Sequence, residues 1–265
     1  MQGRLSPQPD GPSQQFPHNT WRDEFERART LGFDAIEWLY DIHMDMRNPL
    51  LSELGRAELR LLSKNTGVSV HSVCGQAFID GGLVRSEIST MESLLCLIEA
   101  SQDVGIKRII LPLLETASVQ TDESWRCLLN FLEQCSSQLQ ESGLKLLFET
   151  SADADALCRC LNMEANPFFG ICYDVGNRTA DGADVLQEIA ALSHMISEVH
   201  LKDRRYGGPN VALGSGDADF DSIFAVLRDM MPPLILETTA GEDWEASAGK
   251  NIAFVREKLL ADADQ

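Results

Sequence analysis

Four residues in the second half of the chain have the side-chain types of a divalent-metal site. Each lies at or near the end of a short apolar run: Glu149, Asp174, His200 and Glu237. Carboxylate oxygens with one imidazole suit Mn2+, Mg2+, Co2+ or Zn2+ and leave coordination positions for substrate oxygens. Such a set, converging without basic neighbours at those positions, would repel itself strongly unless a cation neutralised it. We therefore expect a divalent metal ion here, provided that the fold brings the four residues together.

The apolar runs that carry these residues are typical of buried parallel strands, because they are short and rich in β-branched residues. Seven strands are expected, at 34–39, 68–73, 108–113, 144–149, 169–174, 197–201 and 234–237, with a short candidate first strand at 1–5. Amphipathic helices are expected between them, from Asn19 or Thr20 to Leu31 and over 52–66, 86–104, 122–142, 153–163, 182–194, 219–230 and 244–261. Several of these helices end in a glycine just before the next strand, which is a common stop signal.

Eight strand–helix units with short connections predict a single (β/α)8 TIM barrel that spans residues 1–265 as one domain. A doubly wound open sheet is the alternative, but no glycine-rich phosphate loop follows the first strand. In a barrel, the carboxyl ends of all strands meet at one rim. Strands five to eight would therefore each deliver one of the four candidate ligands to that rim.

Composition restricts the partners and the compartment. The formal net charge of −19 argues against a nucleic-acid partner, because binding a phosphate backbone needs a positive surface. No apolar stretch is long enough to span a membrane, and the start lacks the apolar core of a signal peptide. The seven cysteines lie mostly in apolar runs and show no zinc-finger spacing, which fits a reducing compartment. A cytoplasmic protein without a membrane partner is expected.

Several segments resemble the xylose isomerase-like TIM barrel superfamily along the whole chain. They are Leu147-Phe148-Glu149-Thr150, Tyr173-Asp174-Val175-Gly176-Asn177, Val199-His200-Leu201-Lys202-Asp203-Arg204, Leu213-Gly214-Ser215-Gly216-Asp217-Ala218-Asp219-Phe220 and Leu236-Glu237-Thr238. The opening Met1-Gln2-Gly3-Arg4-Leu5-Ser6 and Gly32-Phe33-Asp34-Ala35-Ile36-Glu37-Trp38 resemble its sugar-phosphate isomerase/epimerase branch. Members often form dimers or tetramers, so a homo-oligomer is compatible with the resemblance.

The resemblance implies that Glu149, Asp174, His200 and Glu237 are the four metal ligands, and that Glu149 and Glu237 are also the acid/base pair. The expected function is a metal-dependent isomerase or epimerase of a sugar, a sugar phosphate or a related polyol ketone. One glutamate would remove a proton next to a carbonyl and the other would return it, through an enediolate that the metal stabilises. Two alternatives stay open: a metal-dependent dehydratase of an inosose-like keto-polyol, and a non-catalytic sugar-binding barrel.

Departures from endonuclease IV, a nuclease relative, limit the site to one metal ion. That enzyme holds three zinc ions and needs further histidines, where this chain has Asn177, Asn210 and, after the fourth strand, Leu113 and Leu114. Asparagine amides are poor zinc ligands and leucines are none. The ketose 3-epimerases also tend to have a substrate-contacting histidine near the position of Asn177, so the asparagine found here argues against that subfamily.

Further polar residues are candidates for substrate binding. Lys202, Arg204 and Arg205 could hold a phosphate or carboxylate, or could instead form a solvated loop paired with Asp203. The other candidates are His71 (alternatively a core residue), Gln76, Asn177, Glu37 and, as an apolar wall, Trp38. The glycine-rich segment 207–216 is either a loop that closes over substrate or a simple turn.

Overall fold

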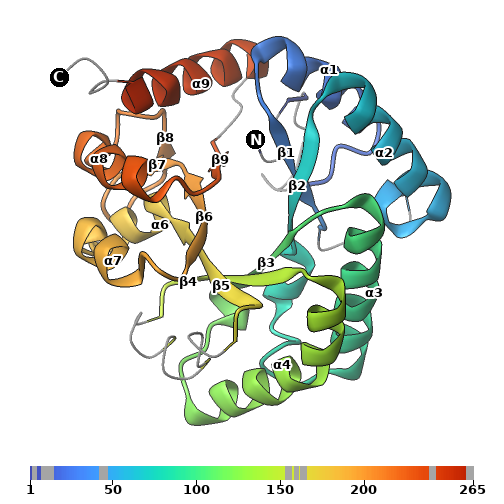
Figure 1. The fold of residues 1–265 in the computed structure, drawn as a ribbon. Coiled ribbons are helices and arrows are strands. Elements are labelled where there is room, and N and C mark those ends of the chain that lie inside the picture. Colours follow the sequence, from blue (N-terminus) through green and yellow to red (C-terminus); the bar gives the residue numbers. More distant parts are fainter. Residues whose placement is uncertain are drawn as a thin grey trace.

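The computed structural model describes residues 1, 5–6, 15–41, 47–152, 157, 161, 166–238 and 243–260. Within them, seven parallel strands form one sheet, which curves into a nearly closed ring (Figure 1). In order around the ring, they are β1 (Ala35–Leu39), β2 (Ser69–Cys74), β3 (Arg108–Leu113), β4 (Lys145–Thr150), β5 (Phe169–Asp174), β6 (Ile196–Leu201) and β9 (Leu234–Leu236).

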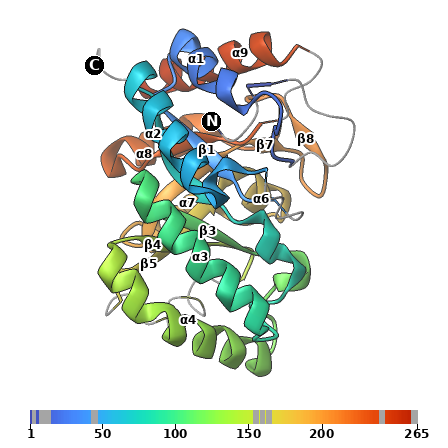
Figure 2. The same cartoon turned by 90° about the vertical axis from the view of Figure 1, so that its right-hand side faces the viewer.

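Helices surround this ring, as Figures 1 and 2 show. They are α1 (Trp21–Leu31), α2 (Glu53–Thr66), α3 (Ile88–Val104), α4 (Asp122–Ser142), α7 (Val185–Leu192), α8 (Phe220–Met230) and α9 (Trp244–Leu260). Shorter elements follow the carboxyl ends of strands: η1 (Pro49–Leu51), η2 (Gln76–Asp80), η3 (Glu115–Ala117), α6 (Val175–Ala180) and an antiparallel pair, β7 (Asp203–Arg204) with β8 (Asn210–Val211). In the described part of the chain, no helix combines the length and apolarity needed to cross a bilayer.

The predicted barrel is confirmed, and its seven described strands begin and end within one residue of the predicted bounds. The first strand expected at 1–5 lies partly outside the described residues. Met1, however, pairs with the edge of β1 that faces away from β2: its amino group donates to Ala35 O, and Glu37 N donates to Met1 O. The helix expected over 153–163 falls mostly outside the described residues. The helix expected over 182–194 is shorter, at Val185–Leu192, and α6 precedes it.

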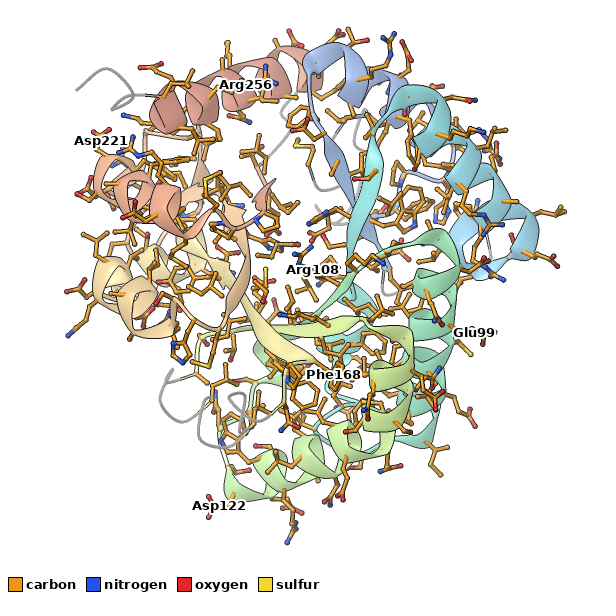
Figure 3. All side chains as sticks on the ribbon, viewed as in Figure 1. Glu99, Arg108, Asp122, Phe168, Asp221 and Arg256 are labelled. Carbon is orange, nitrogen blue, oxygen red and sulfur yellow. The ribbon has the colours of Figure 1, made fainter. Side chains whose placement is uncertain are left out.

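Alternation along the strands separates two environments. In β6, Val199 and Leu201 belong to the apolar core that the helices cover, whereas Glu198 and His200 lie on the other face. Glu198 contacts Ser72 of β2, which is not a sheet neighbour of β6, so this contact crosses the interior of the ring. Arg108 also lies inside the ring (Figure 3). The ring interior therefore holds a layer of polar side chains, and the main apolar core lies between strands and helices.

Glu24 of α1 offers a test of the packing between helix and barrel, because its side chain is buried away from the site. Burial raises its pKa to about 7, although hydrogen bonds to Ser6 and Leu5 and the charge of Arg27 act in the opposite direction. A carboxyl whose folded pKa exceeds its unfolded value favours folding when protonated. It loses this contribution as the pH rises from its unfolded pKa of 4.5 to about 7.

Through Glu24, the free energy of unfolding of the wild type should fall by up to about 3 kcal/mol between about pH 4 and pH 8. We predict that Glu24→Gln abolishes this part of the pH dependence. Urea unfolding in the presence of a chelator measures this slope for the wild type and the variant. Glu141→Gln, at an exposed position, is the matched control and should keep the wild-type slope. Equal slopes in all three proteins would contradict a raised pKa at Glu24.

Candidate metal centre

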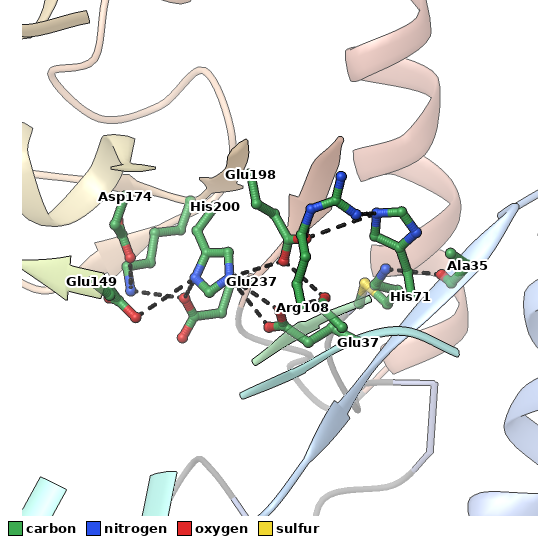
Figure 4. Close-up of polar contacts among 12 residues, drawn as sticks. Ala35, Glu37, His71, Arg108, Glu149, Asp174, Glu198, His200 and Glu237 are labelled. Atoms are coloured by element: carbon green, nitrogen blue, oxygen red, sulfur yellow. Dashed lines mark hydrogen bonds and ion pairs between the residues drawn. The ribbon is translucent and has the colours of Figure 1, made fainter. Parts of the chain in front are cut away.

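The four expected ligands meet at the carboxyl ends of their strands, where Figure 4 shows them together. Asp174 is the last residue of β5 and lies opposite His200 of β6 in the strand register, Glu149 is near the end of β4, and Glu237 directly follows β9. One ligand atom from each lies within 4.8 Å of the others, and all four residues are buried. The barrel thus joins residues that are up to 88 positions apart (237 − 149) in the sequence.

Lys202 places an ammonium group directly beside this cluster. Its Nζ lies 2.5 Å from Asp174 Oδ2 and 3.1 Å from Glu237 Oε2. Burial alone would lower the pKa of Lys202, but the carboxylates of Asp174, Glu237 and Glu149 outweigh it and raise that pKa. The Lys202 side chain can lie here because residue 176 is a glycine: a Cβ on Gly176 would lie only 2.5 Å from Lys202 Cγ. We expected Lys202 to contact substrate; in the structure, its charge is committed to the ligand carboxylates.

Asn177 connects the cluster to the next loop. Its backbone N–H donates to Asp174 Oδ1, and its Nδ2 donates to Glu149 Oε1 at 3.0 Å. Its Oδ1 accepts a hydrogen bond from Arg204 Nη1, also at 3.0 Å. These bonds fix one oxygen of Glu149 and leave Oε2 facing His200 Nδ1 at 3.8 Å. Asn177 therefore contacts the cluster and orients a candidate ligand, while its expected contact with substrate stays a prediction.

The chemistry of the donor set fits a divalent ion. His200 Nδ1 lies 3.0 Å from Glu237 Oε2, yet it is buried without a partner in hydrogen-bond geometry. Burial, with Asp174 and Glu237 nearby, raises the pKa of Glu149 to about 8, so that this group takes up a proton at neutral pH. A buried imidazole nitrogen without a hydrogen-bond partner and a carboxyl whose pKa is raised by its neighbouring carboxylates both favour a cation at this position. These four residues could hold a metal ion.

A second polar layer lies beneath the ligands and was not foreseen from the sequence. Ser72 Oγ lies within hydrogen-bond distance of both Glu37 Oε2 (2.9 Å) and Glu198 Oε1 (2.8 Å). Burial, together with the charge of Glu37, raises the pKa of Glu198 well above its usual range. Strand alternation was the available signal, since Glu198 precedes His200 by two residues and must share its face.

Two substrate candidates lie elsewhere. Glu37 is not at an open pocket: it is fully buried inside the ring, beside His200. Trp38, the next residue on the strand, points the opposite way, packs against Trp21 and Phe25 of α1, and donates from Nε1 to Asn48 Oδ1. The expectation that Trp38 walls the pocket is therefore wrong, because strand alternation turns its ring toward the helix layer.

His71 also departs from the expectation. It is the third residue of β2, and its Nε2 lies 2.6 Å from Arg108 Nη1, where Arg108 begins β3. His71 lines a cavity of about 410 Å³ with residues that precede strands, such as Asp34 and Pro233. It thus lies toward the amino-terminal end of the barrel, away from the ligand rim, and cannot serve as the rim contact that we expected.

The remaining candidates lie on the ligand side. Gln76 begins η2, at the carboxyl end of β2. Arg204 donates to Gly208 O from two nitrogens, and Arg205 pairs with Asp217 at 2.9 Å. Asp203 pairs with neither arginine; it accepts from Gly216 N at 2.7 Å and so ties the glycine-rich segment into a turn.

Comparison with known proteins agrees with this architecture. A family model described as "Xylose isomerase-like TIM barrel" matches residues 25–258. The chain belongs to this family. It is 30% identical over 227 residues to the L-ribulose-5-phosphate 3-epimerase UlaE of Salmonella paratyphi C (strain RKS4594), with 78% of each chain covered. This member of the xylose isomerase-like family is thus similar to a sugar-phosphate epimerase over 78% of its length.

Solved structures of low sequence identity share the fold. An L-ribulose 3-epimerase superposes with a TM-score of 0.78 at 18% identity, over 98% of this chain and 94% of that one. The IOLI protein, solved with a bound zinc atom, superposes with a TM-score of 0.72 at 15% identity, over 91% of this chain and 92% of that one. At these identities, the likeness concerns the barrel alone.

We predict that Asp174→Asn lowers the affinity for Mn2+ or Zn2+ at least about tenfold, since even the loss of a ligand's own hydrogen-bond partner commonly costs 10- to 100-fold. Titration calorimetry on chelator-treated protein measures the affinity. Asp221→Asn, which removes an exposed carboxylate on α8, is the control and should bind like the wild type. Unchanged binding by the Asp174 variant would exclude this residue as a ligand.

Proposed function

We propose that this chain is a divalent-metal-dependent epimerase or isomerase of a ketose or a related keto-sugar, with Glu149 and Glu237 as the proton-transfer pair. The observation that carries the proposal is the convergence of these two glutamates with Asp174 and His200 within 4.8 Å. The similarity to an L-ribulose-5-phosphate 3-epimerase supports the substrate class. A single divalent ion held by the four residues would supply the positive charge that stabilises an enediolate.

The positions of the two glutamates suit transfer between opposite faces of a substrate carbon. Glu149 comes from β4 and Glu237 follows β9, and β5 and β6 separate these strands in the sheet. The carboxylates therefore approach the rim from different sides. Inversion needs one group that removes a proton and another that delivers one from the other face, so two separated carboxyl groups meet the geometric requirement.

Charge around the pair also favours proton transfer. The pKa of Glu149 is raised to about 8 in the metal-free chain, whereas a bound cation would stabilise the carboxylate form and lower it. Asn177 holds one oxygen of Glu149 through a hydrogen bond of 3.0 Å, which keeps the other oxygen directed into the cluster. The positive charge of Lys202 beside Glu237 favours the ionised carboxylate of that residue.

The three basic residues expected to hold a substrate phosphate already have partners within the protein. Lys202, Arg204 and Arg205 each pair within the protein, with carboxylates or with backbone and amide oxygens. We propose that their main role is to hold the ligand cluster and the following hairpin. The assay below accordingly uses matched phosphorylated and unphosphorylated ketoses.

The metal-loaded protein, incubated in D2O with ketoses and their phosphates, should place deuterium at the carbon that is inverted. We predict that Glu149→Gln and Glu237→Gln each reduce this turnover by at least about 100-fold, the usual contribution of a general acid or base. NMR and mass spectrometry of the products locate and count the deuterium.

Glu141→Gln serves as the control and should retain wild-type turnover. Wild-type rates in both glutamate variants would refute the two-glutamate mechanism. A product lighter by one water, with deuterium next to its carbonyl, would replace the epimerase assignment with a dehydratase.

A further inference from the structure

The two ring nitrogens of His200 face different carboxylates. Nδ1 is directed toward the rim, with Glu237 Oε2 at 3.0 Å and Glu149 Oε2 at 3.8 Å. Nε2 is directed into the barrel, with Glu37 Oε1 at 3.2 Å and Glu37 Oε2 at 3.3 Å. Both His200 and Glu37 are completely buried, so bulk water does not compete for either nitrogen.

Glu37 is held in place by a network that reaches across the barrel. Ser72 Oγ lies 2.9 Å from Glu37 Oε2, and it also lies 2.8 Å from Glu198 Oε1 on the strand that carries His200. The backbone N–H of Glu37 donates to Met1 O, and the register of β1 against β2 shifts at this residue. Figure 4 shows the resulting chain of contacts, which runs from the ligand cluster through His200 to these two carboxylates.

Two other groups lie near the ring of His200. Cys172 also hydrogen-bonds to His200, but its sulfur is only a weak acceptor. Glu198 Oε1 lies 4.0 Å from His200 Nε2, which is longer than a hydrogen bond, whereas both oxygens of Glu37 lie within reach. A carboxylate that accepts the N–H of one ring nitrogen fixes the tautomer and leaves the lone pair on the other nitrogen.

We propose that Glu37 is a positioning residue for the metal centre: it accepts the Nε2–H of His200 and thereby presents the Nδ1 lone pair to the divalent ion. This inference rests on the metal dependence in the proposed function. It also gives Glu37 a role different from the substrate contact expected from the sequence. Glu37 contacts the candidate ligand His200 at Nε2, the ring nitrogen that faces away from the ligand cluster.

The first test needs no substitution. In the Zn2+-loaded wild type, labelled with 15N-histidine, long-range proton–nitrogen spectra should show the hydrogen of His200 on Nε2, with His200→Asn providing the assignment. A hydrogen on Nδ1 would overturn the proposal. If the wild type binds no divalent ion, the proposed function itself fails, which calorimetry shows before any spectrum is recorded.

The second test is the affinity of chelator-treated variants for Mn2+ and Zn2+. Glu37→Gln should weaken binding about 10- to 100-fold and should redistribute the His200 tautomers, because a carboxamide can donate to Nε2 as well as accept from it. Glu198→Gln, the same change at the neighbouring buried carboxyl, should weaken binding far less. Wild-type affinity in Glu37→Gln, or equal losses in both variants, would overturn the proposal while leaving the metal site itself intact.

Discussion

Repulsion among three buried carboxylates is the constraint on which the rest of this site depends. The candidate ligand atoms lie within 4.8 Å of one another, and two unit charges at that limit repel by about 3–4 kcal/mol at the effective dielectric constant that suits protein sites. Lys202 offsets part of this cost, and its close approach requires the absence of a side chain at Gly176. The remaining repulsion raises the pKa of Glu149, and a cation at the rim would relieve it. The three carboxylates are brought together because their residues lie at or next to the ends of strands of one sheet.

The same repulsion between carboxylates also concerns the barrel interior, where Glu37 and Glu198 lie beside His200. An imidazole beneath three carboxylates would tend to gain a proton and lose its use as a ligand. The inner carboxylates make this interior unusual, because a barrel of this kind is ordinarily filled by branched apolar side chains. Here that packing survives as a small cluster of Ile110, Leu147 and Cys172, while the main apolar core lies outside the strands. The outer face of each strand thus packs in the apolar core, and the inner face carries the polar residues of the candidate site.

The sequence predicted the barrel, its seven described strands and the four residues of the cluster, because apolar runs that end in a polar residue mark strand ends directly. It failed where the face of a strand matters. Glu37 and Trp38 are adjacent, and only the contacts of the folded chain show which one enters the ring. Lys202 was misjudged for another reason: a lysine after a strand looks solvent-exposed until the carboxylates of distant strands are placed around it. Such convergence between segments far apart is a property of the closed sheet, and no local pattern contains it.

Asp203 and Lys202 are neighbours in the chain, yet they have different contacts. Asp203 accepts a hydrogen bond from the turn at Gly216, whereas Lys202 pairs with the carboxylates at the rim. A Cβ on Gly216 would lie 2.0 Å from Asp203 Oδ1, so the turn between β8 and α8 can seat against this carboxylate only where residue 216 has no side chain. Insertions in the 207–216 segment would therefore be tolerated at its tip but not beside Gly216, where the segment contacts Asp203. Because Asp203 adjoins Lys202, the anchor of this loop and the ammonium group next to the carboxylates come from consecutive residues. Divergence toward new substrates would accordingly be easier through the loops after other strands than through this one.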